Sequence, residues 1–243
     1  MPTKQFNHFL LQIPLFSGLS PETLKIFTDA IKTRKCTRGE ALFLHEEDAS
    51  FFYIITRGWV KLFRETLDGD EAIVDILTTR HMFGETAIFE DGTYPYSAET
   101  VSDAEILILP TSTLEMAAQT DNKVALNLLK TMSFYRKQQS SEIEHLTVQN
   151  APQRIGCFLL RLCDPEAQGS ITLHLPYDKM LIASRLGMKK ETFSRALSRL
   201  KTDAGIKVHG GTITINDMQV MADYCCSACS SSFPCADLKS TSP

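Results

Sequence analysis

The chain has 243 residues, of which 43% are hydrophobic and 22% are charged, which supports a packed core, excludes bulk disorder and favours two domains. Its net charge of −4 excludes an overall basic protein that coats nucleic acid, although one local surface can still be basic. No apolar run reaches the ~18–20 residues of a membrane span, and no signal peptide is recognisable. We therefore expect a cytoplasmic protein without a membrane partner.

Residues 9–32 show helical periodicity, and a new helix is predicted to begin after Ser20 because Pro21 suits the first helical position and Glu22 the positive first turn. From residue 39 to about residue 109 the pattern changes to short apolar runs separated by turn residues, including the hairpin signal Asp68-Gly69. Strands are expected at 41–44, 51–55, 59–63, 72–77, 97–101 and 104–109. Such a series predicts a β-barrel or jelly roll.

The segment from Ala125 to Leu146 contains neither Gly nor Pro and is predicted to be one long helix. Two interpretations stay open for it, a dimer seam and a helix packed on its own domain, and a long helix that leaves a β-domain favours the dimer. Besides Ala125, the residues with the 4-3-4-3 spacing of a coiled-coil seam are Leu129, Met132, Arg136, Gln139, Ile143 and Leu146.

The stretch from Tyr177 to Lys201 holds seven Lys or Arg against two acidic residues. It predicts two short helices, at 179–186 and 189–201, joined by a turn at Gly187. The first should bury Met180, Ile182 and Ala183, and the second Phe193, Leu197 and Leu200. A two-stranded wing is expected at 205–215, so the whole predicts a winged helix-turn-helix, with a plain αα-hairpin as the alternative.

The outward side of the second helix combines residue types that recognise DNA. Arginine pairs with guanine and glutamate accepts from cytosine, while Lys, Ser and Thr bind phosphates and set the register. The candidate DNA-binding residues are Lys189, Lys190, Glu191, Thr192, Ser194, Arg195, Ser198 and Arg199.

These motifs, together with Ile13-Pro14-Leu15-Phe16-Ser17-Gly18-Leu19-Ser20 and Phe83-Gly84-Glu85, resemble the cAMP receptor protein/FNR superfamily of bacterial regulators over residues 6–221. The resemblance implies a homodimeric transcription activator that works with RNA polymerase. The segment Glu191-Thr192-Phe193-Ser194-Arg195 looks like the E-x-x-S-R signature of the FNR branch, which implies palindromic TTGAT-like half-sites read by Glu191, Ser194 and Arg195.

The resemblance also implies a domain order and an α+β fold class. We expect an effector-sensing, cyclic-nucleotide-binding-like β-barrel or jelly roll at 1–123 and a dimerisation helix at 124–150. A hinge is expected at Asn150-Ala151-Pro152 because proline disfavours helical backbone in the residue before it. A winged helix-turn-helix at 151–222 and a flexible Cys/Ser-rich tail at 223–243 follow.

The effector is the least determined part of the prediction. In cAMP-binding relatives a Gly-Glu pair is followed by Arg-Ser, and the arginine holds the cyclic phosphate. This chain has Gly84, Glu85 and Ser97 but Pro95 or Tyr96 at the arginine position, so cAMP is disfavoured. The candidate effector-pocket residues are Gly84, Glu85, Tyr96 and Ser97; a cyclic-nucleotide-responsive regulator is the alternative.

The likeness to the nitric-oxide-responsive, denitrification-type (DNR-like) branch implies haem as a candidate cofactor, with His81, His145 or Met82 as ligands. An ordinary hydrogen-bonded histidine is the alternative. An FNR-type iron–sulfur centre is not expected, since no cysteine precedes Cys36.

The remaining features leave two further alternatives. Cys225, Cys226, Cys229 and Cys235 suggest either a zinc or cluster site or, as we prefer, a redox-reactive tail; no metal site is assigned. No nucleophile–base motif or phosphate-binding loop indicates an enzyme. A nucleotide or metal sensor with a vestigial DNA-binding half is the second hypothesis.

Overall fold

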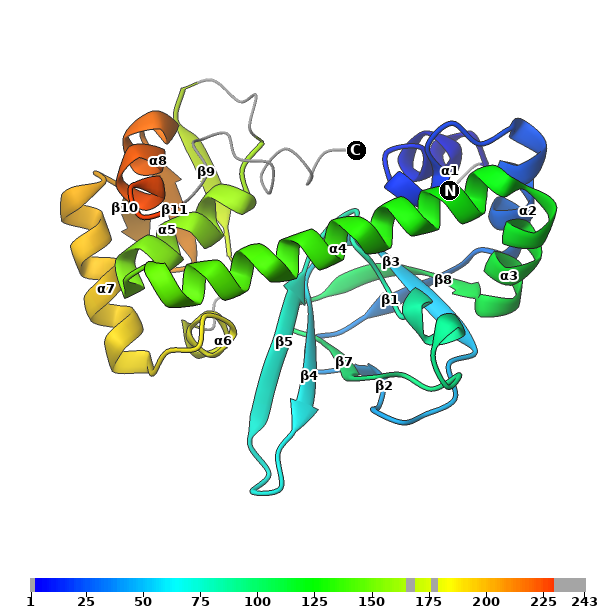
Figure 1. Cartoon of the computed structure of the whole chain (residues 1–243), viewed down its shortest axis with the longest axis horizontal. Coiled ribbons are helices and arrows are strands. Elements are labelled where there is room, and N and C mark those ends of the chain that lie inside the picture. The colour runs from blue at the N-terminus through cyan, green and yellow to red at the C-terminus, as the bar shows by residue number, and fades with distance from the viewer. Residues whose placement is uncertain (1–2, 165–168, 176–178, 230–243) are drawn as a thin grey trace. The chain divides into compact units, whose positions relative to one another are not determined.

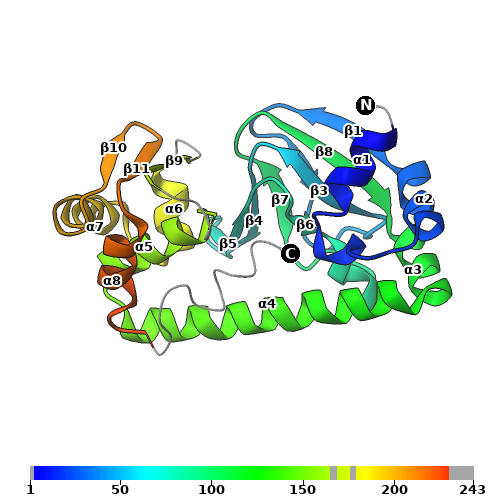
Figure 2. The ribbon, with the colours of Figure 1, turned by 90° about the horizontal axis from the view of Figure 1, so that it is seen from above.

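The computed structural model describes residues 3–164, 169–175 and 179–229 (Figure 1). The described residues divide into two compact units, which meet between Thr131 and Met132. Helix α4 (Asn122–Val148) continues without a break from the first unit into the second (Figure 2). Among the described helices, none is long and apolar enough to cross a membrane.

The first unit contains two four-stranded antiparallel sheets. One has the order β1-β8-β3-β6, and the other has the order β2-β7-β4-β5. The sheets are jelly-roll-like but do not close into a barrel. The predicted fold class is thus confirmed, and of the two predicted forms, β-barrel and jelly roll, the structure has the jelly-roll-like one. Strands β1 and β6 were not expected from the sequence. The strands are β1 (Lys32–Cys36), β2 (Ala41–Phe43), β3 (Phe51–Arg57), β4 (Val60–Glu65), β5 (Glu71–Leu77), β6 (Met82–Phe83), β7 (Ser97–Thr100) and β8 (Ala104–Pro110).

Aromatic side chains fill the space between the two sheets. Phe43 from one sheet stacks on Tyr94 with ring centroids 3.7 Å apart, and Tyr53 stacks on Phe83 at 5.2 Å. Tyr94 also donates a hydrogen bond to the carbonyl of Phe51 at 2.6 Å. Stacked rings bury large apolar areas and restrict one another's orientation, so this core fixes the spacing of the sheets.

Helices cover the other face of the β1-β8-β3-β6 sheet. They are α1 (Thr3–Leu10), the 3-10 helix η1 (Pro14–Phe16), α2 (Pro21–Ala30), α3 (Thr111–Thr120) and the start of α4. Ser20 caps α2 as predicted, because its side chain accepts a hydrogen bond from the amide of Thr23. The buried Asn127 of α4 donates to the carbonyls of Leu15 and Ser17, both at 2.9 Å. These bonds hold α4 against the N-terminal segment.

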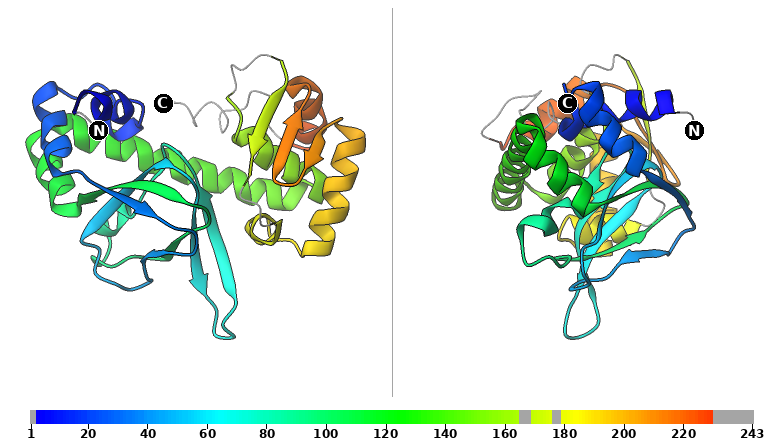
Figure 3. Two further views of the ribbon diagram at one scale, coloured as in Figure 1. Left: turned by 180° about the vertical axis from the view of Figure 1, so that it is seen from behind. Right: turned by 90° about the vertical axis from the view of Figure 1, so that its right-hand side faces the viewer.

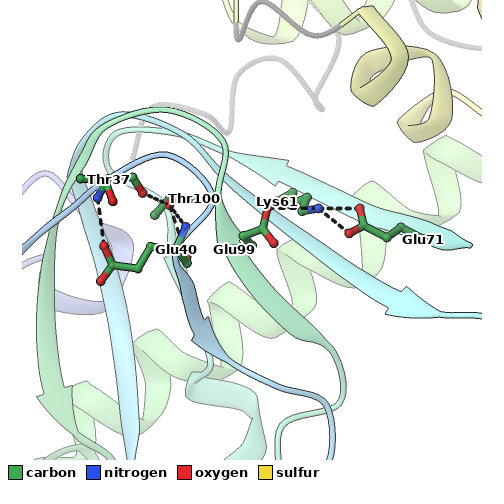
Figure 4. A network of polar contacts seen from close by, with 6 residues as sticks. All are labelled: Thr37, Glu40, Lys61, Glu71, Glu99 and Thr100. Atoms are coloured by element: carbon green, nitrogen blue, oxygen red, sulfur yellow. Dashed lines mark hydrogen bonds and ion pairs between the residues drawn. The ribbon is translucent and has the colours of Figure 1, made fainter. Parts of the chain in front are cut away.

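Two polar clusters join neighbouring strands in the other sheet (Figure 4). The Thr100 hydroxyl donates to the carbonyl of Thr37 at 2.6 Å and accepts from the amide of Glu40 at 3.0 Å. The Lys61 ammonium contacts Glu71 on β5 at 2.6 Å and Glu99 on β7 at 3.3 Å. Beyond Phe63, β4 pairs with β5 but no longer with β7, so this hairpin extends past the rest of its sheet (Figure 3).

After α4, the second unit continues at a hydrogen-bonded helix cap. The Asn150 side chain accepts from the amide of Gln153, and the Gln153 side chain accepts from the amide of Asn150. Helix α5, which starts here, packs against α7 and α8. The elements are α5 (Ala151–Arg161), β9 (Ile171–His174), α6 (Lys179–Arg185), α7 (Lys190–Asp203), β10 (Lys207–His209), β11 (Thr212–Ile215) and α8 (Met218–Cys226).

Three details of this unit differ from the sequence predictions. The wing has three strands rather than two, in the order β10-β11-β9, because β9 pairs with β11. Met180 is 57% exposed, and Leu181 is buried in its place. Helix α8 continues to Cys226 with Cys225 fully buried, so the flexible tail expected from residue 223 does not begin there. Cys235 lies outside the described residues.

Gly156 allows α5 and α8 to approach closely. A Cβ at this position would lie 2.1 Å from Cys225 Sγ. We expect Gly156→Ala to lower the free energy of unfolding by about 1–2 kcal/mol, because overpacking outweighs the better helix propensity of alanine. Urea denaturation in a Cys225→Ala background, which lacks the sulfur, should show little or no loss. An equal loss in both backgrounds would contradict the packing argument.

Candidate functional site

A tight turn joins α6 to α7. Gly187 has a φ of +62°, in the left-handed region that favours glycine. The amide of Met188 donates to the carbonyl of Ala183 at 2.9 Å, and the amide of Gly187 donates to that of Ser184 at 3.0 Å. This pair of bonds is a Schellman motif, which ends α6 and turns the chain into α7. The turn predicted at Gly187 is therefore confirmed.

Helix α7 has one buried and one exposed side. Its apolar residues Phe193, Leu197 and Leu200 are buried, as predicted, and Ala196 joins them. The exposed side consists of the predicted residues Lys190, Glu191, Ser194, Arg195, Ser198 and Arg199, with Thr192 half-buried and Lys189 at the N-cap. The structure thus places all eight candidate DNA-binding residues on or directly before one helix.

Some of these side chains already have partners. The Ser198 hydroxyl donates to the carbonyl of Ser194 at 3.0 Å, and Arg199 Nε lies 3.3 Å from Asp203. Within the described part of the chain, no ion pair involves Lys190 or Arg195. Their charges are therefore available to an anionic partner such as a nucleic acid.

Two of the candidate effector residues, Gly84 and Glu85, lie where β6 passes into the 3-10 helix η2 (Glu85–Phe89). Gly84 has a φ of +84°, and a Cβ there would lie 3.2 Å from the ring of Tyr94. Glu85 is 4% exposed, and its Oε2 has no hydrogen-bond partner among the described residues. Burial raises the pKa of Glu85 to about 7, against the opposing effect of a backbone hydrogen bond.

The other two effector candidates are already engaged in the fold. Ser97 accepts a hydrogen bond from the amide of His45 at 3.0 Å. Burial, and then the carboxyl of Glu85, raise the pKa of Tyr96 above its usual range. Tyr96 also packs against the aromatic core, 6.1 Å from the ring of Phe43. Neither tyrosine nor serine supplies the positive charge that a buried phosphate requires.

The three candidate haem ligands belong to two different units. Met82 packs in the apolar core of the first unit. His81 Nδ1 lies 3.0 Å from the carbonyl of Thr78, in the turn before β6, and His145 belongs to the second unit. A haem between the sheets would have to separate Phe43 from Tyr94, which are stacked. The residues present therefore do not fit a haem in this conformation.

An apolar stripe lies exposed along α4. Leu129, Met132, Ile143 and Leu146 have exposed side chains, and so do Arg136 and Gln139 between them. These are the residues predicted to form a helix seam. Within the described residues, Val124 and Leu128 at the start of α4 face the core of the first unit instead. The stripe is thus distinct from the packed side of the helix.

Comparison with known proteins agrees with this architecture. Residues 33–121 match the cyclic nucleotide-binding domain, and residues 153–224 match the Crp-like helix-turn-helix domain. A solved structure from Ruegeria pomeroyi DSS-3, assigned to the cyclic nucleotide binding proteins, is 36% identical, covers 93% of this chain and 99% of its own, and has a TM-score of 0.72. The chain belongs to the CRP/FNR family of transcriptional regulators.

Other members of this family are similar over most of the chain. The CRP-like cAMP-activated global transcriptional regulator of Mycobacterium tuberculosis is 24% identical, with 89% of this chain and 98% of the relative covered. The structure of DNR from Pseudomonas aeruginosa is 29% identical, covers 89% of this chain and 96% of its own, and has a TM-score of 0.51. Members of other branches match at similar identity, so the comparisons do not distinguish a branch.

Family membership assigns the coarse function. The chain is a Crp-like transcriptional regulator with an effector-binding domain and a helix-turn-helix that binds double-stranded DNA, and family members act as dimers. Its domains and relatives are those of regulators and not of enzymes.

A group of charged residues near the helix-turn-helix was not found from the sequence. Glu142 of α4 contacts Arg161 of α5 at 2.7 Å and Arg185 of α6 at 2.6 Å. Burial opposes ionisation, but Arg185 and Arg161 outweigh it and hold the pKa of Glu142 below its usual range. In the sequence, these residues are charged positions on three separate amphipathic helices. Such a pattern does not show which charged residue pairs with which.

Glu85 should give the first unit a measurable pH dependence. Its pKa in the folded protein, about 7, lies above the ordinary value of 4.5, so the folded state holds the proton more tightly. This stabilising effect is complete below the ordinary pKa and is lost as the pH rises through about 7. In thermal unfolding, Glu85→Gln should match the wild type at about pH 5 and exceed it at about pH 8. The exposed control Glu90→Gln should show no such divergence from the wild type. If the stability of Glu85→Gln follows that of the wild type in parallel at every pH, the argument is refuted.

Proposed function

We propose that this regulator binds palindromic DNA with TTGAT-like half-sites and directs RNA polymerase from there. The observation that carries the proposal is the exposed side of α7, where Glu191, Ser194 and Arg195 stand with the spacing E-x-x-S-R. Arginine can donate two hydrogen bonds to guanine, and glutamate can accept one from cytosine. Lys189, Lys190, Thr192, Ser198 and Arg199 surround these readers with groups suited to phosphates.

The apolar stripe on α4 supports a symmetric dimer as the DNA-binding form. Leu129, Met132, Ile143 and Leu146 would bury their exposed surface against the same residues of a second copy, as in a coiled coil. The polar Arg136 and Gln139 at the centre would fix the register. A two-fold dimer places its recognition helices about 34 Å apart, one turn of DNA, which suits a palindrome.

Arg195→Ala tests the proposal directly. Loss of one bidentate base contact should weaken binding to a TTGAT-N₄-ATCAA duplex by about 1–3 kcal/mol, which is roughly 5- to 150-fold in Kd. Fluorescence anisotropy at fixed salt concentration measures this change. Lys25→Ala, which removes an exposed positive charge from α2, should leave the affinity unchanged. If Arg195→Ala binds as tightly as the wild type, or if no specific binding occurs, the DNA-binding half is vestigial or has another target.

The effector that we propose is a small molecule other than cAMP. The Mycobacterium tuberculosis relative is described as cAMP-activated. In this chain Tyr96 or Pro95 stands where cAMP-binding relatives have the phosphate-binding arginine, and Ser97 is bonded to the backbone of His45. Phe43 and Tyr94 occupy the space between the sheets. These features support loss of the cAMP response.

A nitric-oxide response through haem is the second candidate, supported by the likeness to DNR from Pseudomonas aeruginosa. The packing of His81 and Met82 argues against it in this conformation. We therefore expect that haem titrated into the purified protein gives no stoichiometric Soret band in the ultraviolet–visible spectrum. A saturable band that shifts with nitric oxide and is lost in His81→Ala would establish haem sensing and overturn this expectation.

A further inference from the structure

The second unit contains a small pocket of about 70 Å³ between the end of α4, helix α5 and the end of α6. Its lining includes His145, Gln149, Cys157 and Arg161. Gln149 is 6% exposed; its amide nitrogen donates to Cys229 Sγ at 2.9 Å, and its Oε1 has no partner among the described residues. Buried polar atoms are normally hydrogen-bonded, so this oxygen is an unsatisfied acceptor of a residue that lines the pocket. The volume suits a molecule of a few heavy atoms, since one water needs about 10–15 Å³ by this measure.

Cys157 lines this pocket beside the imidazole of His145 and the guanidinium of Arg161. Its Sγ is 3.8 Å from His145 Nδ1, and Arg161 Nη2 is 3.3 Å from the same nitrogen. Burial opposes the charge of Arg161, but the Cys157 sulfur, followed by Glu142, outweighs burial and raises the pKa of Arg161. A guanidinium beside a sulfur stabilises the thiolate, which is the reactive form of cysteine.

Cys163 provides an internal comparison six residues further along. It is as buried as Cys157, with 4% against 7% exposure. Its Sγ donates to the carbonyl of Leu159 at 3.3 Å, and burial raises its pKa to about 12. Cys163 is therefore an inert thiol with a similar exposed fraction. The two cysteines differ in their electrostatic surroundings and in contact with the pocket.

We propose that Cys157 is a modification site at which a small hydroperoxide oxidises the thiol to a sulfenic acid. The Cys157 sulfur attacks one peroxide oxygen, an S–O bond forms as the O–O bond breaks, and the leaving hydroxide takes the thiol proton to become water. The sulfur loses two electrons and the peroxide gains them. Hydrogen peroxide fits the pocket by size.

The modification would act on the contacts that orient the helix-turn-helix. The added oxygen lies next to Arg161, which also binds Glu142, and Glu142 in turn binds Arg185 on α6. A sulfenate competes with Glu142 for the Arg161 guanidinium. Helix α5, which carries Cys157, packs directly against the recognition helix α7. DNA affinity is thus expected to change on oxidation.

The test uses the full-length protein treated with hydrogen peroxide in the presence of dimedone, which traps sulfenic acids, followed by peptide mass spectrometry. Cys157 should form the adduct at least about ten-fold faster than Cys163, because Cys157 lines the pocket beside His145 and Arg161, whereas the Cys163 thiol donates to the carbonyl of Leu159. Equal rates at the two cysteines would overturn the proposal.

Variants of residues in the pocket distinguish activation of the Cys157 thiol by its neighbours from simple exposure of that thiol. Arg161→Gln and His145→Gln should each slow labelling of Cys157 about five-fold or more, with Cys163 unchanged. Arg154→Gln is the matched control, because Arg154 lines the same pocket but donates to the carbonyl of Leu186. A variant that merely unfolds would accelerate labelling of Cys163 as well. If neither variant slows Cys157 relative to Cys163, the proposed activation is wrong.

Discussion

Burial of the apolar side of α7 is the constraint on which the DNA-binding surface depends. Phe193, Leu197 and Leu200 are withdrawn from water where α7 packs on α5, and each such side chain contributes about 1.5–3 kcal/mol. Only one rotation of α7 about its axis buries all three side chains. The residues on the opposite side are therefore oriented toward solvent without the need for contacts that would hold them there. Arg195 and Glu191 face solvent for this reason. The turn at Gly187 then sets the direction of the helix relative to α6.

In the first unit, the packing of aromatic side chains decides what lies between the two sheets. The space between its sheets holds the stacked rings of Phe43, Tyr94, Tyr53 and Phe83. Such a core stabilises the jelly-roll-like arrangement but occupies the interior with side chains. Glu85 is left buried beside this core with an unpartnered oxygen, and it keeps its proton to a higher pH than an exposed glutamate.

Glu142 connects three helices of the second unit through two arginines. Its carboxylate is shared between Arg161 on α5 and Arg185 on α6, and all three side chains are mostly buried. Removing one member of such a group leaves an uncompensated charge, so its geometry is strongly specified. The end of α4 is thereby tied to the two helices that precede the recognition helix. Chemistry at Cys157 would reach this junction through Arg161.

The sequence by itself determined the order of the two domains, the Ser20 cap, the turn at Gly187 and the exposed face of α7, because these depend on local periodicity and on residues with strong backbone preferences. Only the tertiary structure decided which strands pair, that β9 joins the wing, and that Cys225 is buried against Gly156 rather than part of a tail. It also decided the partners of Glu142 and the filling of the space between the sheets. Those features join residues far apart in the chain, and a periodic pattern records which side of an element is apolar without recording what packs against it.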